Sequence, residues 1–230
     1  MTIAVIVFPG TNCEHDIIHA LGLAGAESEH VWHRDTDLSG AHGIVLPGGF
    51  AHGDYLRTGA IARFSPIMEE VARLADAGVP TLGICNGFQI LCEAGLLPGA
   101  LVANRDLKFI CRPTHLRVES TDSVLTRAAE IGQVLRIPLN SYEGNYVADD
   151  IDNVENAGDV ILRYSDAAGH VDSTTNPNGS TNSIAGITNA GRNVAGLMPH
   201  PERASEKILG SDDGMALIEG FVASTGLVDA

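Results

Sequence analysis

The sequence predicts an α/β protein with an open, mostly parallel sheet flanked by helices, and three observations support this class. The apolar run from Ile3 to Phe8 is typical of a central strand that is buried on both faces. The segment from Asn12 to Ala24 follows with apolar residues at helical spacing, and a second such segment runs from Ile61 to Ala77. Because apolar strands alternate with helical segments, the first half of the chain reads as βαβ units, which form parallel sheets.

The same patterns place the remaining elements. Further strands are expected at 29–33, 43–46 and 79–84, then in the middle of the chain at 116–118, 134–137 and 160–162, and finally at 193–197. Helices are expected from the end of the 79–84 strand to about Glu93 and from Gly210 to Ser224. The 230 residues show no internal repeat and no linker, which favours a single domain over residues 1–230.

Composition excludes several classes of function. The net charge is −15, and no basic patch is visible, so nucleic-acid binding is not expected. No apolar run is long enough to span a bilayer, and no signal peptide precedes the first strand. The four cysteines show no zinc-like spacing, so we expect no metal site and reduced thiols in a cytoplasmic protein. The aspartate- and glutamate-rich, lysine-poor surface is also what a salt-loving organism would select.

The most informative stretch is Gly83-Ile84-Cys85-Asn86-Gly87, where an apolar strand delivers a cysteine into a helical segment. The pattern Gly-x-Cys-x-Gly is the thiol version of the nucleophile elbow, a sharp strand-to-helix turn that small residues make possible. A cysteine at a helix N-terminus is favoured as the thiolate. The competing interpretation is a buried structural cysteine, which is the commoner fate of a free thiol.

A second motif, Met198-Pro199-His200-Pro201-Glu202, supplies the partners that a nucleophilic thiol requires. Pro201 biases His200 towards extended backbone, in which residues i and i+2 point to the same side. Glu202 could therefore orient one imidazole nitrogen while the other faces Cys85. Taken alone the motif would be an ordinary turn, but together with the elbow it favours a Cys85–His200–Glu202 triad.

The segments 83–91 and 196–203 resemble class I, triad-type glutamine amidotransferases. Within that class, 47–60, 8–14 and 176–180 are similar to the branch formed by glutaminase subunits of phosphoribosylformylglycinamidine synthases. The likeness covers essentially the whole chain. One departure is visible, because Ser141 and Tyr142 stand where the family often has His-Gly before Glu-Gly, so a family role for that histidine does not carry over.

The resemblance implies a flavodoxin-like, class I amidotransferase fold and a defined activity. Cys85 would attack the side-chain amide of glutamine, and ammonia would pass to an ATP-dependent synthase that converts formylglycinamide ribonucleotide to formylglycinamidine ribonucleotide in purine biosynthesis. Backbone amides of Gly49, in the turn with Gly48, and of Asn86 would stabilise the oxyanion. Gln89 lies one helical turn beyond Cys85 and would contact the bound glutamine, although a half-buried capping amide is an equal alternative.

The resemblance also limits what the chain does by itself. It has no phosphate loop, so no cofactor is expected in this chain, and ATP and Mg would be used by the partner synthase. The expected partners are the large synthase subunit and a small bridging subunit. Two other functions stay open: a thiol hydrolase or peptidase of similar fold, active without a partner, and a non-catalytic regulatory subunit.

Overall fold

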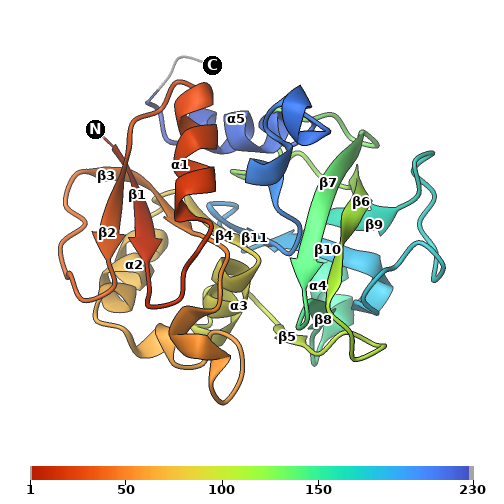
Figure 1. The fold of residues 1–230 in the computed structure, drawn as a ribbon, viewed down its shortest axis with the longest axis horizontal. Helices are drawn as coiled ribbons and strands as arrows, with labels where there is room; N and C mark the ends of the chain where they lie inside the picture. The colour runs from red at the N-terminus through yellow and green to blue at the C-terminus, as the bar shows by residue number, and fades with distance from the viewer. Residues whose placement is uncertain (1, 228–230) are drawn as a thin grey trace.

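The computed structural model describes residues 2–227 and confirms the α/β class. A nine-stranded sheet has the order β2-β1-β3-β4-β11-β10-β9-β6-β7 (Figure 1). Its parallel half comprises β2 (Ser28–Trp32), β1 (Thr2–Val7), β3 (Ala41–Leu46), β4 (Thr81–Ile84) and β11 (Val194–Leu197). Its antiparallel half adds β10 (Ile184–Thr188), β9 (Val160–Ser165), β6 (Ile110–Val118) and β7 (Val134–Ser141). A small second sheet pairs β5 (Ala100–Val102) with β8 (Asn145–Val147).

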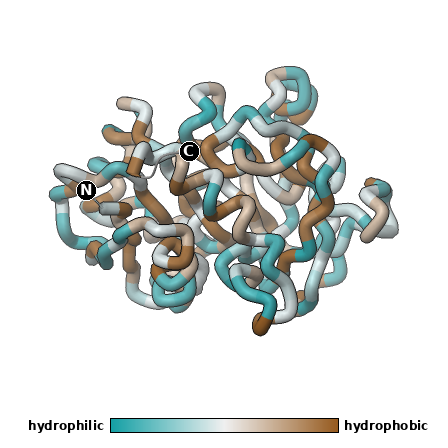
Figure 2. The backbone as a smooth tube through the Cα atoms, turned by 90° about the horizontal axis from the view of Figure 1, so that it is seen from above, coloured by the Kyte–Doolittle hydropathy of each residue, from teal (hydrophilic) through white to brown (hydrophobic). Residues whose placement is uncertain are grey.

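Helices flank this sheet. They are α1 (Glu14–Leu23), α2 (Ile67–Asp76), α3 (Asn86–Glu93), α4 (Ile151–Asn156) and α5 (Met215–Ser224). Helices α1 and α5 contact each other in the upper half of Figure 1, whereas α2 and α3 lie lower, with α3 against β3, β4 and β11. Hydrophobic segments run through the interior of the chain trace (Figure 2). Within residues 2–227, no helix is long and apolar enough to cross a membrane.

Two predicted helices begin later than the apolar pattern indicated. The helix expected from Ile61 begins at Ile67, because Ser65 precedes a proline and takes an extended conformation, with ψ of 141°. The closing helix begins at Met215 rather than Gly210, which has a φ of 101° and ends a short 3-10 turn. Strand β10 was not predicted, although all five of its residues are buried.

Three parallel strands end side by side at the same edge of the sheet. In the register, Leu46 of β3 pairs with Gly83 of β4, and Ile84 of β4 pairs with Leu197 of β11. The chain leaves these strands at residues 47–50, at Cys85 and at residues 198–202. Ligands of open α/β sheets bind beyond the carboxyl ends of the strands, so this edge is the expected location of a site.

Candidate active site

Cys85 forms a strained turn between β4 and α3. Its φ of 51° and ψ of −104° lie outside the regions that L-residues ordinarily adopt. A Cβ on Gly83 would approach the backbone of Gly87 to 2.7 Å, and a Cβ on Gly87 would lie 1.8 Å from the carbonyl oxygen of Leu46. Cys85 is 7% exposed, and its thiol donates to the carbonyl of Asn140 at 3.6 Å. The predicted strand–turn–helix geometry is therefore present, with the cysteine at the turn.

His200 and Glu202 lie just beyond β11, next to the strand that carries Cys85. The amide of His200 donates to the carbonyl of Pro138 at 2.8 Å, which fixes the backbone. The imidazole Nδ1 lies 2.6 Å from Glu202 Oε1, and both side chains are almost completely buried. His200 has φ of −106° and ψ of 89°, short of the extended backbone that was expected, and a 3-10 turn begins at Pro201. The pair is thus formed at the start of a tight turn and not by two residues of an extended segment.

The charge state of His200 depends on this pairing. Burial by itself would lower the pKa of His200, but the negative charge of Glu202, together with Cys85 and Cys13, raises it well above its ordinary value. Nε2 has no hydrogen-bond partner among the described residues. His200 can therefore accept and hold a proton on the nitrogen that Glu202 does not occupy.

The turn after β3 presents backbone amides beside Cys85. Gly49 sits at a non-hydrogen-bonded position of a bridge to Thr11, because the flanking bonds run from Asn12 to Gly48 and from Phe50 to Gly10. Its N–H is therefore not used by that bridge, and Gly49 lines the cavity. A Cβ on Gly48 would come within 2.8 Å of His200 Cε1, so glycine also lets the imidazole approach. The Asn86 side chain accepts a hydrogen bond from Ala51 N at 3.0 Å, which ties this turn to helix α3.

Gln89 lines the same cavity and is 5% exposed. Its amide group donates to the carbonyl of Glu143 at 2.6 Å and accepts from Asn86 Nδ2 at 2.8 Å. Gln89 is therefore held by the protein on both ends of its amide. The contact with Glu143 joins helix α3 to the segment around residue 143, which lines the cavity from another side.

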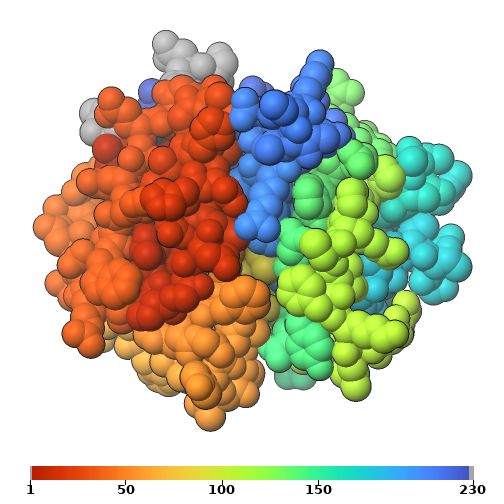
Figure 3. Space-filling view, viewed as in Figure 1, coloured from red at the N-terminus to blue at the C-terminus, as the bar shows by residue number. Residues whose placement is uncertain are grey.

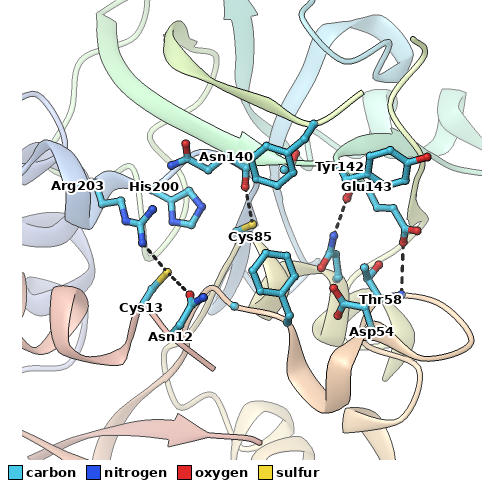
Figure 4. A pocket seen from close by; sticks show the side chains of 15 residues that line it. Asn12, Cys13, Asp54, Thr58, Cys85, Asn140, Tyr142, Glu143, His200 and Arg203 are labelled. Atoms are coloured by element: carbon cyan, nitrogen blue, oxygen red, sulfur yellow. Dashed lines mark hydrogen bonds between the residues drawn. The ribbon is translucent and has the colours of Figure 1, made fainter. Parts of the chain in front are cut away.

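A single cavity of about 350 Å³ joins these groups. Figure 3 shows the surface hollowed along the seam between the N-terminal segments and the segments after residue 100. The close view in Figure 4 shows the side chains converging from both sides. The lining residues are Asn12, Cys13, Gly49, Phe50, Asp54, Thr58, Cys85, Gln89, Phe109, Asn140, Ser141, Tyr142, Glu143, His200 and Arg203.

Two carboxylates face the cavity on the side away from His200. Asp54 is half-buried, and burial together with the nearby charge of Glu143 raises its pKa to about 6. Asn86 Nδ2 donates to Asp54 at 3.3 Å, and the amide of Thr58 donates to Glu143 at 3.4 Å. No cationic side chain contributes to the shift of Asp54. The sequence placed Asp54 in a loop near the site but gave no sign that Glu143 would face it.

Cys13 and Arg203 form the opposite end of the cavity, and neither was predicted as a site residue. Cys13 is the N-cap residue of α1 and is 2% exposed. Arg203 Nη2 donates to Cys13 Sγ at 3.2 Å, and Arg203 Nε donates to Asp16 at 3.1 Å. The only sequence clue was their membership of the segments 8–14 and 196–203 that carry the family resemblance.

The divergent segment at Ser141 and Tyr142 also lines the cavity. The carbonyl of Ser141 accepts from Asn104 Nδ2 at 2.9 Å, whereas its hydroxyl is buried without a hydrogen-bond partner in the described part of the chain. Tyr142 is 44% exposed at the cavity mouth. The segment thus shapes the wall opposite Cys85 through its backbone, and no imidazole stands there.

The fold and this cysteine-based site define the class of protein. A family model for a CobB/CobQ-like glutamine amidotransferase domain matches residues 1–213, and the chain belongs to this family. In this chain the four parallel strand pairs bring the turn at Cys85 and the paired His200–Glu202 to one edge of the sheet.

Relatives within the family are closely similar over their whole length. The phosphoribosylformylglycinamidine synthase subunit PurQ of Chlorobium luteolum is 54% identical over 220 residues, covering 94% of this chain and 95% of that protein. The same subunit of Koribacter versatilis is 51% identical, covering 97% and 98%. A chain in the structure of PurLQS from Thermotoga maritima is 44% identical, with a TM-score of 0.86 and coverage of 96% and 97%.

Proposed function

We propose that this chain hydrolyses glutamine to glutamate and ammonia and supplies the ammonia to a phosphoribosylformylglycinamidine synthase. The synthase converts formylglycinamide ribonucleotide to formylglycinamidine ribonucleotide in purine biosynthesis. The observation that carries the proposal is the buried Cys85, on a strained turn, sharing one cavity with His200, whose imidazole contacts Glu202. High similarity over nearly the full length of PurQ subunits supports the choice of this synthase over other amidotransferases.

Cys85 acts as the nucleophile in this mechanism. Its sulfur attacks the side-chain carbonyl carbon of glutamine, and His200 holds the thiol proton on Nε2. His200 then donates that proton to the departing nitrogen, so ammonia leaves and a γ-glutamyl thioester remains. A water molecule, deprotonated by His200, attacks the thioester and releases glutamate and the thiol. Glu202, through its 2.6 Å contact with Nδ1, keeps the imidazole oriented and stabilises its charged form.

Backbone amides stabilise the tetrahedral oxyanion formed in both steps. The N–H of Asn86 points from the first turn of α3, where intrahelical acceptors are lacking, and Gly49 lines the cavity from the other side. Each such donor contributes about 3–4 kcal/mol to transition-state stabilisation. Because Asn86 Oδ1 accepts from Ala51, the two donors are held in fixed relation before substrate arrives.

Asp54 and Glu143 bind the α-ammonium group of glutamine. Burial and, after it, the neighbouring charge of Glu143 raise the pKa of Asp54, and a positive ligand would relieve the repulsion between the two carboxylates. Thr58 and Asn86 already donate to these carboxylates and hold them in place. Gln89 positions residue 143 and contributes one wall of the glutamine site.

The cavity mouth fits a docking surface for the synthase. Phe50 and Phe109 line the cavity and are 49% and 53% exposed, and Tyr55 and Leu56, which follow the cavity-lining Asp54 in the chain, are 73% and 90% exposed. Apolar side chains grouped around an active-site opening are typical of an interaction surface. The partner is the large, ATP- and Mg-dependent synthase subunit, with a small bridging subunit in the same complex. This chain itself uses no cofactor.

The location and domain organisation stay predictions from the sequence. All four cysteines are free, in keeping with a reducing, cytoplasmic compartment. One continuous sheet contains β1 to β4, β6, β7 and β9 to β11, which supports the prediction of a single domain over 1–230.

The decisive experiment replaces Cys85 by Ser. The variant is expected to lose glutamine-dependent synthesis by the assembled complex and to retain synthesis from added ammonia, because only the glutaminase half passes through the thioester. Product is measured with each nitrogen donor in turn. Cys111→Ser, at an exposed position outside the cavity, serves as the control. Glutamine-dependent turnover in Cys85→Ser would remove Cys85 as the nucleophile, whereas full activity of the free chain would favour a stand-alone thiol hydrolase.

A further inference from the structure

Three polar side chains, those of His33, His52 and Ser65, pack together behind the loop that follows Gly49, and none of them lines the cavity. His33 and Ser65 are each 7% exposed, and His52 is half-buried. His33 Nδ1 lies 3.0 Å from Ser65 Oγ, and His52 Nε2 lies 3.5 Å from the same oxygen. The two imidazole rings meet edge to face, with centroids 5.2 Å apart. The proposed reaction gives this cluster no task.

The surroundings of this cluster favour an uncharged pair of histidines. Burial, and after it the positive charge that His52 can carry, lower the pKa of His33, so its imidazole is mostly neutral at pH 7. A neutral imidazole has one N–H and one acceptor nitrogen, so the hydroxyl of Ser65 can donate to one ring and accept from the other. Phe8 adjoins both rings, with centroid distances of 6.1 and 6.4 Å. Ser65 therefore bridges the two histidines in a largely apolar setting.

His52 connects the cluster to the loop that carries Asp54. The backbone amide of His52 donates to the carbonyl of Pro9 at 2.6 Å. From His52 to Asp54 the backbone is left-handed, with φ of 55°, 73° and 53°. Such a conformation is strained for residues with side chains and persists only where the surroundings hold it. Asn86 Nδ2 contacts Asp54 at 3.3 Å on the cavity side, and the imidazole of His52 anchors the other side of the loop.

We propose that His52 is a positioning residue for glutamine, which acts by fixing the conformation of Asp54. The inference rests on the proposed function, in which Asp54 binds the α-ammonium group. Gly49, which carries the proposed oxyanion donor, is held separately by its bridge to Thr11. Loss of the His52 contact should therefore weaken recognition of the ammonium group and leave the chemical step at Cys85 nearly unchanged.

The test measures kcat and KM of the chain in its complex with two substrates, glutamine and glutaramate, which lacks the α-amino group. His52→Asn is the main variant, because asparagine tolerates the left-handed backbone and its side chain is too short to replace the ring. KM for glutamine should rise by about tenfold, whereas kcat, and kcat/KM for glutaramate, should stay within about twofold. Ser65→Ala, which removes the bridging hydroxyl, should change KM in the same direction. His170→Gln, at a side chain that is 75% exposed, is the control and should behave as the wild type does.

A double variant tests whether His52 acts through Asp54. Adding His52→Asn to Asp54→Asn should change KM for glutamine by less than about twofold, because the group that His52 positions is already lost. Effects that multiply would overturn the proposal, as would an equal loss of kcat/KM with both substrates, which would show a general structural role. An unchanged KM in Asp54→Asn would also exclude this route, while the assignment of Cys85 would stand on its own experiment. If His52→Asn does not fold, Ser65→Ala is judged by the same criteria.

Discussion

At the scale of single residues, two pairs of neighbouring ionisable groups define the site. Glu202 is buried against His200, and the imidazole has a raised pKa because of that carboxylate despite the opposing effect of burial. Asp54 and Glu143 show the reverse situation, since two like charges share one wall of the cavity. In the proposed reaction the first pair transfers a proton, and the second pair binds the ammonium group of the amino acid substrate.

Replacing the members of the His200–Glu202 pair should affect activity to different degrees. His200→Ala is expected to reduce kcat by about 10²–10⁴-fold, because it removes the general base and acid. Glu202→Gln is expected to be milder, since the imidazole remains but loses its orienting charge. The measurement is kcat for glutamine hydrolysis by the complex, with folding of each variant checked by thermal melts. A Glu202→Gln enzyme with unchanged kcat would mean that another group orients the histidine.

Replacing Asp54 should reveal how the α-ammonium group is recognised. Asp54→Asn removes a charged hydrogen bond, which contributes about 1.5–3 kcal/mol, so KM for glutamine should rise by roughly tenfold to a hundredfold. Glutaramate, which is glutamine without its amino group, is the comparison substrate. The wild type should prefer glutamine strongly, and Asp54→Asn should lose most of that preference. Equal preference in both enzymes would assign ammonium recognition to other groups.

The pH dependence of the same variant has a defined sign. Because the pKa of Asp54 is about 6, kcat/KM of the wild type should fall below pH 6 as the carboxylate is protonated, and Asp54→Asn should lack that limb.

The contribution of Asp54 to the free energy of unfolding should depend on pH in the opposite direction, decreasing as pH rises. The folded-state pKa is raised from 3.8, so the folded chain binds this proton more tightly and is destabilised as pH rises from about 4 to 6. Asp54→Asn should therefore melt higher than the wild type above pH 6 and equally below pH 4.

At the scale of elements, the junction of β4 and α3 sets the position of Cys85, the proposed nucleophile. Helix α3 packs on β3, β4 and β11 at the same time, and its first turn approaches the end of β3 closely. Gly87 is in contact with the backbone of Leu46, which leaves no room for a side chain. The strained conformation of Cys85 is held because the strand and the helix on its two sides are both buried.

This close packing makes a prediction about stability. Gly87→Ala would place a Cβ 1.8 Å from the carbonyl oxygen of Leu46, so the helix or the strand must move, and we expect a loss of about 3 kcal/mol or more. Gly22 is the matched control, since it lies within helix α1 with no atom within 4 Å of its ideal Cβ. Gly22→Ala should stabilise the chain by about 0.5–1 kcal/mol. Denaturant melts measure both, and a Gly87→Ala chain as stable as the wild type would show that this contact is easily relieved.

At the scale of the whole molecule, negative charges greatly outnumber positive charges. The net charge is −15, and Lys108 and Lys207 are the only lysines in the sequence. The described ion pairs use arginine or histidine with one exception, the pair between Lys207 and Asp212 at 3.7 Å. Most acidic groups therefore repel one another across the surface, and this repulsion opposes the compact state.

Salt should consequently stabilise the protein. At about 0.01 M salt the Debye length is about 30 Å and the whole surface interacts, whereas at 1 M it is about 3 Å. The melting temperature is expected to rise steadily from low to molar KCl. A series in NaCl controls for effects specific to potassium. A melting temperature that stays flat or falls would identify the acidic surface as ordinary solvation and would remove the inference of a salt-loving source.

The sequence by itself determined the elements that its apolar periodicity marks and the chemistry that its motifs carry. Strand β1, helix α1 and the strand–turn–helix at Cys85 follow from contiguous residues, because burial and backbone strain leave a local pattern. The pairing of His200 with Glu202 could be predicted for the same reason, since two positions in one short segment fix it.

Tertiary structure alone decided which distant segments meet. Strand β10, with the short sequence Ile-Ala-Gly-Ile-Thr, acquires its place only by pairing with β9 and β11. Asp54 faces Glu143, and Cys13 reaches His200, through loops whose residues carry no periodicity. Contacts of this kind depend on how the sheet brings the ends of its strands together. No single stretch of sequence encodes them, and the cavity that they form exists only in the folded chain.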